Sequence, residues 1–101
     1  MVILKSLTWG ARHGYAITEW IQAATGGELL IEEGTLYPAL HRLEKKGHVE
    51  AEWGLSEKNR KAKYYQLTRS GEKQLGMEAG IWQRYSDAIA RAMSCSVPEP
   101  L

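Results

Sequence analysis

The sequence has 101 residues, of which 44% are hydrophobic and 25% are charged, and its formal net charge is +1. This length allows one domain with a modest core, and the chain has neither an apolar run near the roughly 20 residues of a membrane helix nor the layout of a signal peptide. We therefore expect a cytoplasmic protein without membrane contact, in which the single cysteine, Cys95, forms no internal disulfide.

Positive charge is concentrated in the middle of the chain. Residues 34–63 contain seven basic and four acidic residues, a net charge of +3, whereas residues 1–33 sum to −2 and residues 64–101 to zero. The overall charge alone is no argument for a nucleic-acid partner. Its distribution, however, places the basic residues in one continuous segment, and that segment is the candidate for an anionic partner.

Two helices are predicted in the first quarter of the chain. The first carries Ile3, Leu4 and Leu7 and ends near Gly10. The second begins at Gly14, and its apolar residues follow the i, i+3, i+4, i+7 spacing of a helix that packs on a core. These apolar residues are Ile17, Trp20, Ile21 and Ala24. Small residues at 25–27 end the second helix, and a short extended segment is expected at 29–31.

Residues 33–47 predict a third helix with two different faces. One face carries Leu36, Leu40 and Leu43, spaced as in a helix packed on a core. The opposite face gathers side chains suited to a DNA groove, where base edges and phosphates both need partners. They are Tyr37, Pro38, His41, Arg42 and Lys45. Because proline is tolerated in the first turn of a helix, Pro38 predicts that the helix begins near Gly34 or Thr35.

A β-hairpin with a basic tip is predicted after Gly47. From His48 the period of the sequence changes to two, with Val49, Ala51 and Trp53 on one side of a half-buried strand. Turn-forming residues occupy 54–59, and residues 61–67 form the returning strand. The bases of this segment favour contact with a nucleic-acid backbone. Charged residues on an edge strand also protect a sheet from aggregation, so the lysines have an ordinary alternative purpose.

A final helix is predicted after the hairpin, with Thr68 or Ser70 as its cap. Its apolar residues form two neighbouring stripes that cover about half of its circumference. The first stripe comprises Leu75, Ala79, Trp82, Ile89 and Met93, and the second comprises Ile81, Tyr85, Ala88 and Ala92. One small domain does not need to bury so much, so we interpret the surplus as a dimer surface.

The order of helix, helix, helix, hairpin and helix defines the predicted architecture. The fold class is mainly α with a β-hairpin (α+β), as a winged helix-turn-helix followed by a C-terminal dimerisation helix. We assign residues 1–68 to the winged helix-turn-helix DNA-binding domain, residues 69–94 to the dimerisation helix and residues 95–101 to a flexible tail. In this architecture the third helix enters the major groove, and the hairpin is the wing.

Several segments of the sequence resemble the PadR family of bacterial transcriptional regulators. They are LKSL at 4–7, HGYAI at 13–17, EEGTLYPALHRL at 32–43, Gly47, Trp53, RKAKYYQLT at 60–68 and Gly71. The resemblance covers roughly residues 2–93. It implies a homodimeric repressor that binds an inverted repeat in a promoter, and a short C-terminal helix. It also permits release by a small aromatic effector, since some relatives respond to phenolic or drug-like compounds.

The candidate site residues fall into three groups. For contact with double-stranded DNA we predict Thr35, Tyr37, Pro38, His41, Arg42, Arg60, Lys61, Lys63 and Tyr15. For the dimer interface we predict Ile3, Leu4, Leu7, Trp82, Tyr85 and Ile89, and for an effector pocket Trp82 and Tyr85. Among the wing bases, Lys63 is favoured as a phosphate contact. Tyr15 has a core position as its alternative, and Trp9, Trp20 and Trp53 are interpreted as core or hairpin-packing residues.

Other classes of function are less well supported by the sequence. It contains no H-E-x-x-H or C-x-x-C motif and no glycine-rich phosphate loop, so we expect neither an enzyme nor a bound metal or cofactor. The stronger alternative is a winged helix that serves as a protein-protein interaction module without DNA sequence preference. A DNA reader loses affinity steeply with salt and keeps a preferred site, whereas such a module has no preferred duplex.

Overall fold

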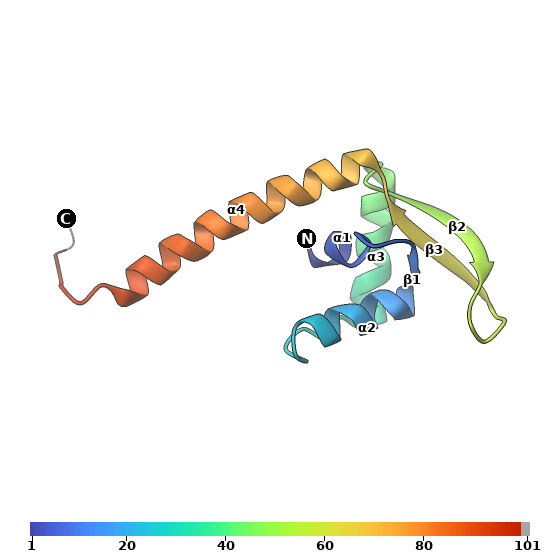
Figure 1. Cartoon of the computed structure of the whole chain (residues 1–101), viewed down its shortest axis with the longest axis horizontal. Helices are drawn as coiled ribbons and strands as arrows, with labels where there is room; N and C mark the ends of the chain where they lie inside the picture. Colours follow the sequence, from blue (N-terminus) through green and yellow to red (C-terminus); the bar gives the residue numbers. More distant parts are fainter. Residues whose placement is uncertain (100–101) are drawn as a thin grey trace.

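A computed structural model describes residues 1–99 as a small body from which one long helix projects (Figure 1). The body contains α1 (Val2–Ser6), β1 (Arg12–His13), α2 (Gly14–Ala24), α3 (Glu33–Lys45), β2 (Val49–Leu55) and β3 (Lys61–Leu67). The projecting helix is α4 (Arg69–Ser94), and it makes the molecule 61 Å long but only 28 Å and 23 Å across. The predicted fold class, mainly helical with a β-hairpin, is confirmed.

The sheet has a third strand that the sequence did not predict. Its order is β1-β3-β2, with antiparallel pairing throughout, and β1 pairs Arg12 with Tyr65 and His13 with Tyr64. A strand of two residues is too short to show an alternating sequence pattern, so only its pairing with β3 identifies it as a strand. This short pairing fixes the start of α2 beside the hairpin. The segment 29–31, expected to be extended, has no helix or strand.

The core lies between α1, α2, α3 and the base of the sheet. Its buried hydrophobic residues are Ile3, Leu4, Leu7, Ile17, Ile21, Leu36, Leu40, Val49 and Tyr65. The helical spacing of Ile17 and Ile21 in α2 and of Leu36 and Leu40 in α3 explains why those faces turn inward. The assignment of Ile3, Leu4 and Leu7 to a dimer interface is wrong, because these side chains are only 9%, 0% and 2% exposed within one chain.

Helix α3 ends in a glycine-dependent C-cap, as predicted. Gly47 has φ of 76°, its N–H donates to the carbonyl of Glu44 at 3.0 Å, and the N–H of His48 donates to the carbonyl of Leu43 at 2.9 Å. This pair of bonds is the Schellman arrangement, which requires the left-handed backbone that glycine adopts without a penalty. The chain is thereby turned directly from α3 into the wing.

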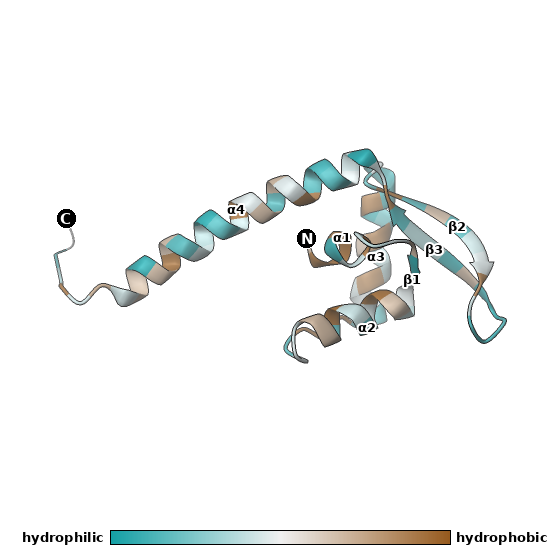
Figure 2. Cartoon of the chain, viewed as in Figure 1, coloured by the Kyte–Doolittle hydropathy of each residue, from teal (hydrophilic) through white to brown (hydrophobic). Residues whose placement is uncertain are grey.

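The wing is the hairpin of β2 and β3, closed by a turn at residues 56–60. The N–H of Ser56 donates to the carbonyl of Arg60 at 2.8 Å, and Asn59 has φ of 59° in the turn. Of the tryptophans interpreted as core or hairpin-packing residues, Trp9 and Trp53 are not core residues, because their side chains are 64% and 61% exposed. Trp53 is on the same face of β2 as Val49, as the alternating pattern predicted, but the buried core does not extend along the strand as far as Trp53. Figure 2 shows a predominantly hydrophilic wing tip.

Helix α4 is fixed to the body at its first turn. Thr68 is the cap: its hydroxyl accepts a hydrogen bond from the N–H of Gly71 at 3.0 Å and donates one to the carbonyl of Gly47 at 2.6 Å. Ser70 instead lies 2.9 Å from Nδ1 of His48. These contacts join α4 to the base of the wing. Within residues 1–99, none of the helices has the length and apolar character that a membrane crossing requires.

The remainder of α4 has little contact with the body. Met77, Ile81, Trp82 and Tyr85 are all more than half exposed, and hydrophobic residues recur between hydrophilic ones along the projecting part in Figure 2. The predicted tail begins after the helix, and residues 95–99 contain no helix or strand. Residues 100 and 101, the end of that tail, lie outside the described residues.

Candidate nucleic-acid interface

The outer face of α3 is exposed as its sequence pattern predicts. Leu36 and Leu40 are buried, whereas Thr35, Tyr37, Pro38, His41 and Arg42 are all exposed. Donors, acceptors and an apolar ring are therefore available along this face of the helix.

Pro38 occupies a different place in α3 from the one expected. The helix begins at Glu33, one residue earlier than predicted, and Pro38 lies in the second turn instead of the first. Proline has no N–H to donate to the carbonyl four residues before it, and that residue is Gly34. The exposed proline therefore breaks the helical bonding pattern on the outer face, close to the N-terminus of α3.

Tyr37 connects the outer face of α3 to the start of α2. A Cβ atom placed on Gly14 would lie 2.5 Å from the Tyr37 hydroxyl oxygen and 2.9 Å from the adjoining ring carbon. The phenol therefore rests directly on the backbone of Gly14, and only glycine leaves room for it. Since the ring is still 45% exposed, Tyr37 also presents a surface to the solvent.

The start of α2 is organised by two residues that flank Gly14. His13 is the cap of the helix, and its Nδ1 accepts a hydrogen bond from the N–H of Ala16 at 3.2 Å. In this geometry Nδ1 carries no proton. The ring of Tyr15 stacks on that of His13 with centroids 6.5 Å apart, and it is 67% exposed. The core alternative for Tyr15 is therefore wrong.

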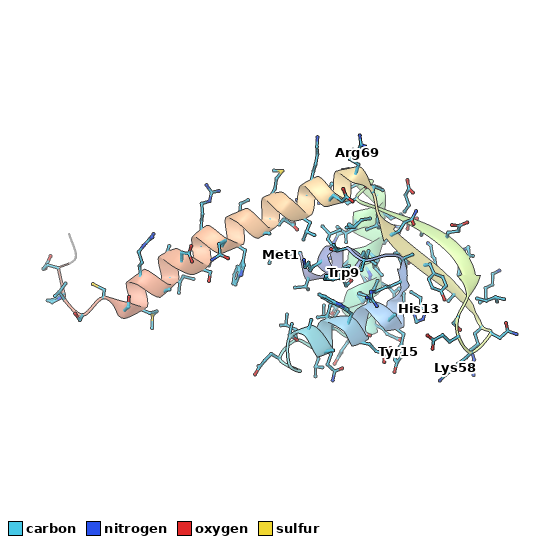
Figure 3. The ribbon with its side chains drawn as sticks, in the orientation of Figure 1. Met1, Trp9, His13, Tyr15, Lys58 and Arg69 are labelled. Atoms are coloured by element: carbon cyan, nitrogen blue, oxygen red, sulfur yellow. The ribbon has the colours of Figure 1, made fainter. Side chains whose placement is uncertain are left out.

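A groove of about 690 Å³ separates the wing from the first turns of α2 and α3. Figure 3 shows Tyr15 near the start of α2 and Lys58 at the wing tip, both on the same side of the molecule. Five predicted DNA-contact residues line this groove: Tyr15, Tyr37, Arg60, Lys61 and Lys63. The four others, Thr35, Pro38, His41 and Arg42, lie outside it on the exposed face of α3.

The basic side chains of the groove and of α3 differ in whether they already form an ion pair. Nζ of Lys63 forms an ion pair with Oε1 of Glu44 at 3.5 Å and lies 5.6 Å from the centre of the Tyr65 ring. This pair is about one-third exposed, and such pairs stabilise proteins by less than about 1 kcal/mol, so a phosphate can compete for the lysine. In the described part of the chain, Arg42, Arg60 and Lys61 form no ion pair.

Tyr65 forms the buried wall of the groove. Burial raises the pKa of its phenol above the ordinary value of 10.0, because the charged phenolate loses its hydration. The ammonium of Lys63 lowers that pKa in part, whereas Glu44 and Tyr37 raise it. Tyr65 is therefore held in its neutral form, and the positive charge of the groove comes from the lysines and Arg60.

Sequence reasoning did not assign two residues of this surface. Trp53 lines the groove from the wing, although its alternation with buried residues had indicated packing inside the protein. Gly14 lies under Tyr37, and its position between His13 and Tyr15 at a helix start was the available signal. Neither role follows from the sequence, because each depends on a contact between separate elements.

The predicted dimer residues of α4 lie on the projecting helix. Trp82, Tyr85 and Ile89 are 53%, 60% and 44% exposed, and the rings of Trp82 and Tyr85 are 6.2 Å apart. Exposed side chains of this size are unusual on a helix that stands away from its own body. They are available to a partner, but one chain alone does not enclose a ligand with them.

Known proteins are similar to this chain over most of its length. A transcriptional regulator from Clostridium thermocellum is 32% identical, with a TM-score of 0.80 and coverage of 89% of this chain and 87% of that one. A protein of known structure from Streptococcus mutans is 31% identical, with a TM-score of 0.82 and coverage of 98% and 89%. An uncharacterized protein of Lysinibacillus sphaericus is 34% identical over 88 residues, which are 87% of this chain and 81% of that protein.

A winged helix with an exposed third helix beside a basic groove is an arrangement typical of DNA-binding transcription regulators. The model of the transcriptional regulator PadR-like family matches residues 3–77. The chain belongs to this family, as its sequence motifs predicted. Family membership also makes it a regulator and not an enzyme.

Proposed function

We propose that the protein is a homodimeric repressor that binds an inverted-repeat operator in the cytoplasm. The observation that carries this proposal is the joint position of the exposed α3 face and the basic groove. Residues such as His41 and Arg42 can reach base edges and phosphates in a major groove, while the wing follows the adjacent backbone. Direct readout by α3 and positioning by the wing together give sequence-specific binding.

The projecting helix supports the dimer. Its 26 residues span about 39 Å, and in the described part of the chain the large apolar side chains from Ile81 to Met93 are exposed. Paired α4 helices bury them and relate two winged domains by a two-fold axis, which an inverted repeat matches. In this arrangement residues 1–68 form the DNA-binding domain, residues 69–94 the dimerisation helix and residues 95–101 a flexible tail.

The paired helices also provide the proposed effector site. Trp82 and Tyr85 offer two neighbouring aromatic rings that are exposed on a single chain. A second α4 laid against them forms the opposite wall of a pocket suited to a flat aromatic compound. Such a compound changes the angle between the two winged domains and so releases the operator.

Selection of binding sites from random duplex DNA tests the proposal. We expect a two-fold-symmetric motif whose half-sites are about one helical turn, or roughly 34 Å, apart. Enriched sites without symmetry would contradict the dimer, and the absence of any preferred duplex would favour the protein-protein interaction module instead. The salt dependence of binding, measured with the selected motif and a scrambled duplex, separates specific from purely ionic association.

Repression is tested by placing the selected motif across a promoter of a reporter gene. We expect expression to fall when the protein is produced and to remain unchanged with a scrambled motif. Higher expression in the presence of the protein would show activation and contradict the repressor role. Flat aromatic compounds added to this assay are expected to restore expression, and the scrambled motif shows whether the compounds affect the reporter itself.

A further inference from the structure

Trp53 lies at a position where the fold itself gains little from a tryptophan. In the ladder of β2 and β3 it is opposite Lys63, and Ala51 is opposite Tyr65 on the same face. Tyr65 reaches the core, whereas Trp53 is 61% exposed to solvent. A large aromatic side chain is therefore presented at the mouth of the groove instead of being packed within the protein.

The other face of the wing carries contacts of Tyr64 that join the two strands near this position. Tyr64 donates a hydrogen bond from its hydroxyl to the carbonyl of Leu55 at 2.9 Å, which crosses the hairpin near its tip. Gly54 leaves room for the Tyr64 ring, whose carbons would lie 3.2 Å from a Cβ atom there, and the ring of His13 meets Tyr64 edge-on at 5.4 Å. Tyr64 therefore packs on the face of the wing opposite to Trp53, and Trp53 itself stays exposed.

The groove surrounds Trp53 with the two kinds of group that a nucleic-acid backbone needs. Nζ of Lys61 lies 5.2 Å from the centre of the indole, so a cation and an apolar face are adjacent. Across the groove are the exposed rings of Tyr15 and Tyr37. A DNA backbone alternates charged phosphates with sugars, and the sugars present apolar C–H groups.

We propose that Trp53 is a DNA-contact residue of the wing, whose indole packs on the sugar next to the phosphate bound by Lys61. This inference rests on the proposed DNA-binding function and adds a contact of a different physical kind. A lysine contact releases counterions and weakens with salt, whereas an indole that covers a sugar excludes water and is insensitive to salt. Trp53 therefore maintains affinity at ionic strengths where the lysine contacts weaken.

The experiment measures operator affinity from about 50 to about 300 mM salt, a roughly sixfold range over which counterion release changes the affinity strongly. We expect Trp53→Ala to lower affinity roughly tenfold at every salt concentration and to leave the slope of log affinity against log salt unchanged. Lys61→Met is expected to reduce that slope by about one per chain. Trp53→Phe keeps an aromatic face and should retain most of the affinity.

Trp9→Ala is the matched control. This tryptophan is 64% exposed, is paired with Trp20 at 5.5 Å and does not line the groove. Its loss should leave operator affinity unchanged. A second readout uses a chain with Trp9, Trp20 and Trp82 replaced by Phe, in which Trp53 fluorescence is expected to shift to shorter wavelength when the operator binds.

The outcomes separate this inference from the proposed function. If the unmodified protein binds no duplex, the DNA-binding proposal fails first. If it binds its operator while Trp53→Ala, folded by circular dichroism, binds equally well, the contact proposed for Trp53 is overturned. An altered salt slope for Trp53→Ala would also overturn it, because the residue would then act through the lysines. Unchanged fluorescence of the single-tryptophan chain on binding contradicts it independently.

Discussion

Tyr37 and Gly14 form a contact that ties the outer face of α3 to the start of α2. A methyl group on Gly14 would overlap the Tyr37 hydroxyl, yet alanine is otherwise the better helix residue. We expect Gly14→Ala to destabilise the protein by about 1 kcal/mol, since overpacking outweighs the gain in helix propensity. The free energy of unfolding in urea measures this change.

A double-mutant cycle supplies the control for that contact. In a Tyr37→Ala background the obstructing ring is gone, so Gly14→Ala is expected to be neutral or stabilising. Equal effects of Gly14→Ala in both backgrounds would show that the two residues do not interact and that Tyr37 is free to move away. The cycle therefore tests the geometry of the site without depending on DNA binding.

Tyr65 makes the stability of the fold depend on pH in the alkaline range. Because burial raises the pKa of its phenol in the folded chain, the folded state holds the proton more tightly than the unfolded state does. The contribution is complete below the unfolded value of 10.0 and is lost as the pH rises from there through the folded pKa. Melting temperatures between pH 8 and about 11 should therefore fall less steeply for Tyr65→Phe than for the unmodified protein.

Tyr15→Phe is the matched control for the titration, because Tyr15 is 67% exposed and lies outside the proposed dimer interface. We expect its melting profile to follow that of the unmodified protein throughout the alkaline range. A Tyr65→Phe profile that coincides with both would contradict a selective role for the buried phenol and assign the alkaline loss to other groups.

The first turn of α4 determines how the long helix leaves the body. Gly71 is buried there, and a Cβ atom on it would overlap the backbone carbonyl of His48. Because two main-chain segments would have to separate, we expect Gly71→Ala to cost about 3 kcal/mol in the free energy of unfolding. Gly80→Ala, in open space on the same helix, should instead stabilise by about 1 kcal/mol. A smaller effect at Gly71 than at Gly80 would contradict the close approach.

Helices and hairpin were predictable from the sequence wherever one local rule was sufficient. Gly47 ends α3 because the C-cap needs positive φ, and Thr68 begins α4 because its hydroxyl caps a free N–H. The strand β1 was not predictable, since Arg12 and His13 become a strand only by pairing with Tyr65 and Tyr64. Local patterns define elements, whereas such pairing depends on the assembled fold.

The candidate site was predictable in composition but not in detail. Periodicity separated Leu36 and Leu40 from the exposed face of α3, and charge distribution located the basic wing. Apolar spacing could not distinguish a residue that packs on its own chain from one that packs on another, so Leu4 was placed at an interface although it is buried in the core. For the same reason the place of Trp53 in the groove was not predicted: the sequence pattern indicated its strand face but not its neighbours.

Assembly of the whole molecule depends on side chains that a single chain leaves exposed. Trp82 is 53% exposed in the middle of the projecting helix, and the nearby Tyr85 and Ile89 are exposed as well. If paired α4 helices form the dimer, Trp82→Ala removes one of the largest apolar surfaces that the interface can bury. We expect the variant to shift toward monomer in sedimentation at micromolar concentration and to lose operator affinity, because two linked half-site contacts become one.

Gln83→Ala is the matched control for that dimer prediction. Gln83 is exposed next to Trp82, and its side chain amide donates a hydrogen bond to Asp87 on the same helix at 3.0 Å. Because this contact is internal to α4, its loss should alter neither sedimentation nor affinity for the complete operator. For Trp82→Ala, affinity for an isolated half-site should stay unchanged, since α3 and the wing are intact. A dimer that survives Trp82→Ala would place the interface on another surface, and a lost half-site affinity would show that α4 acts within the DNA-binding domain itself.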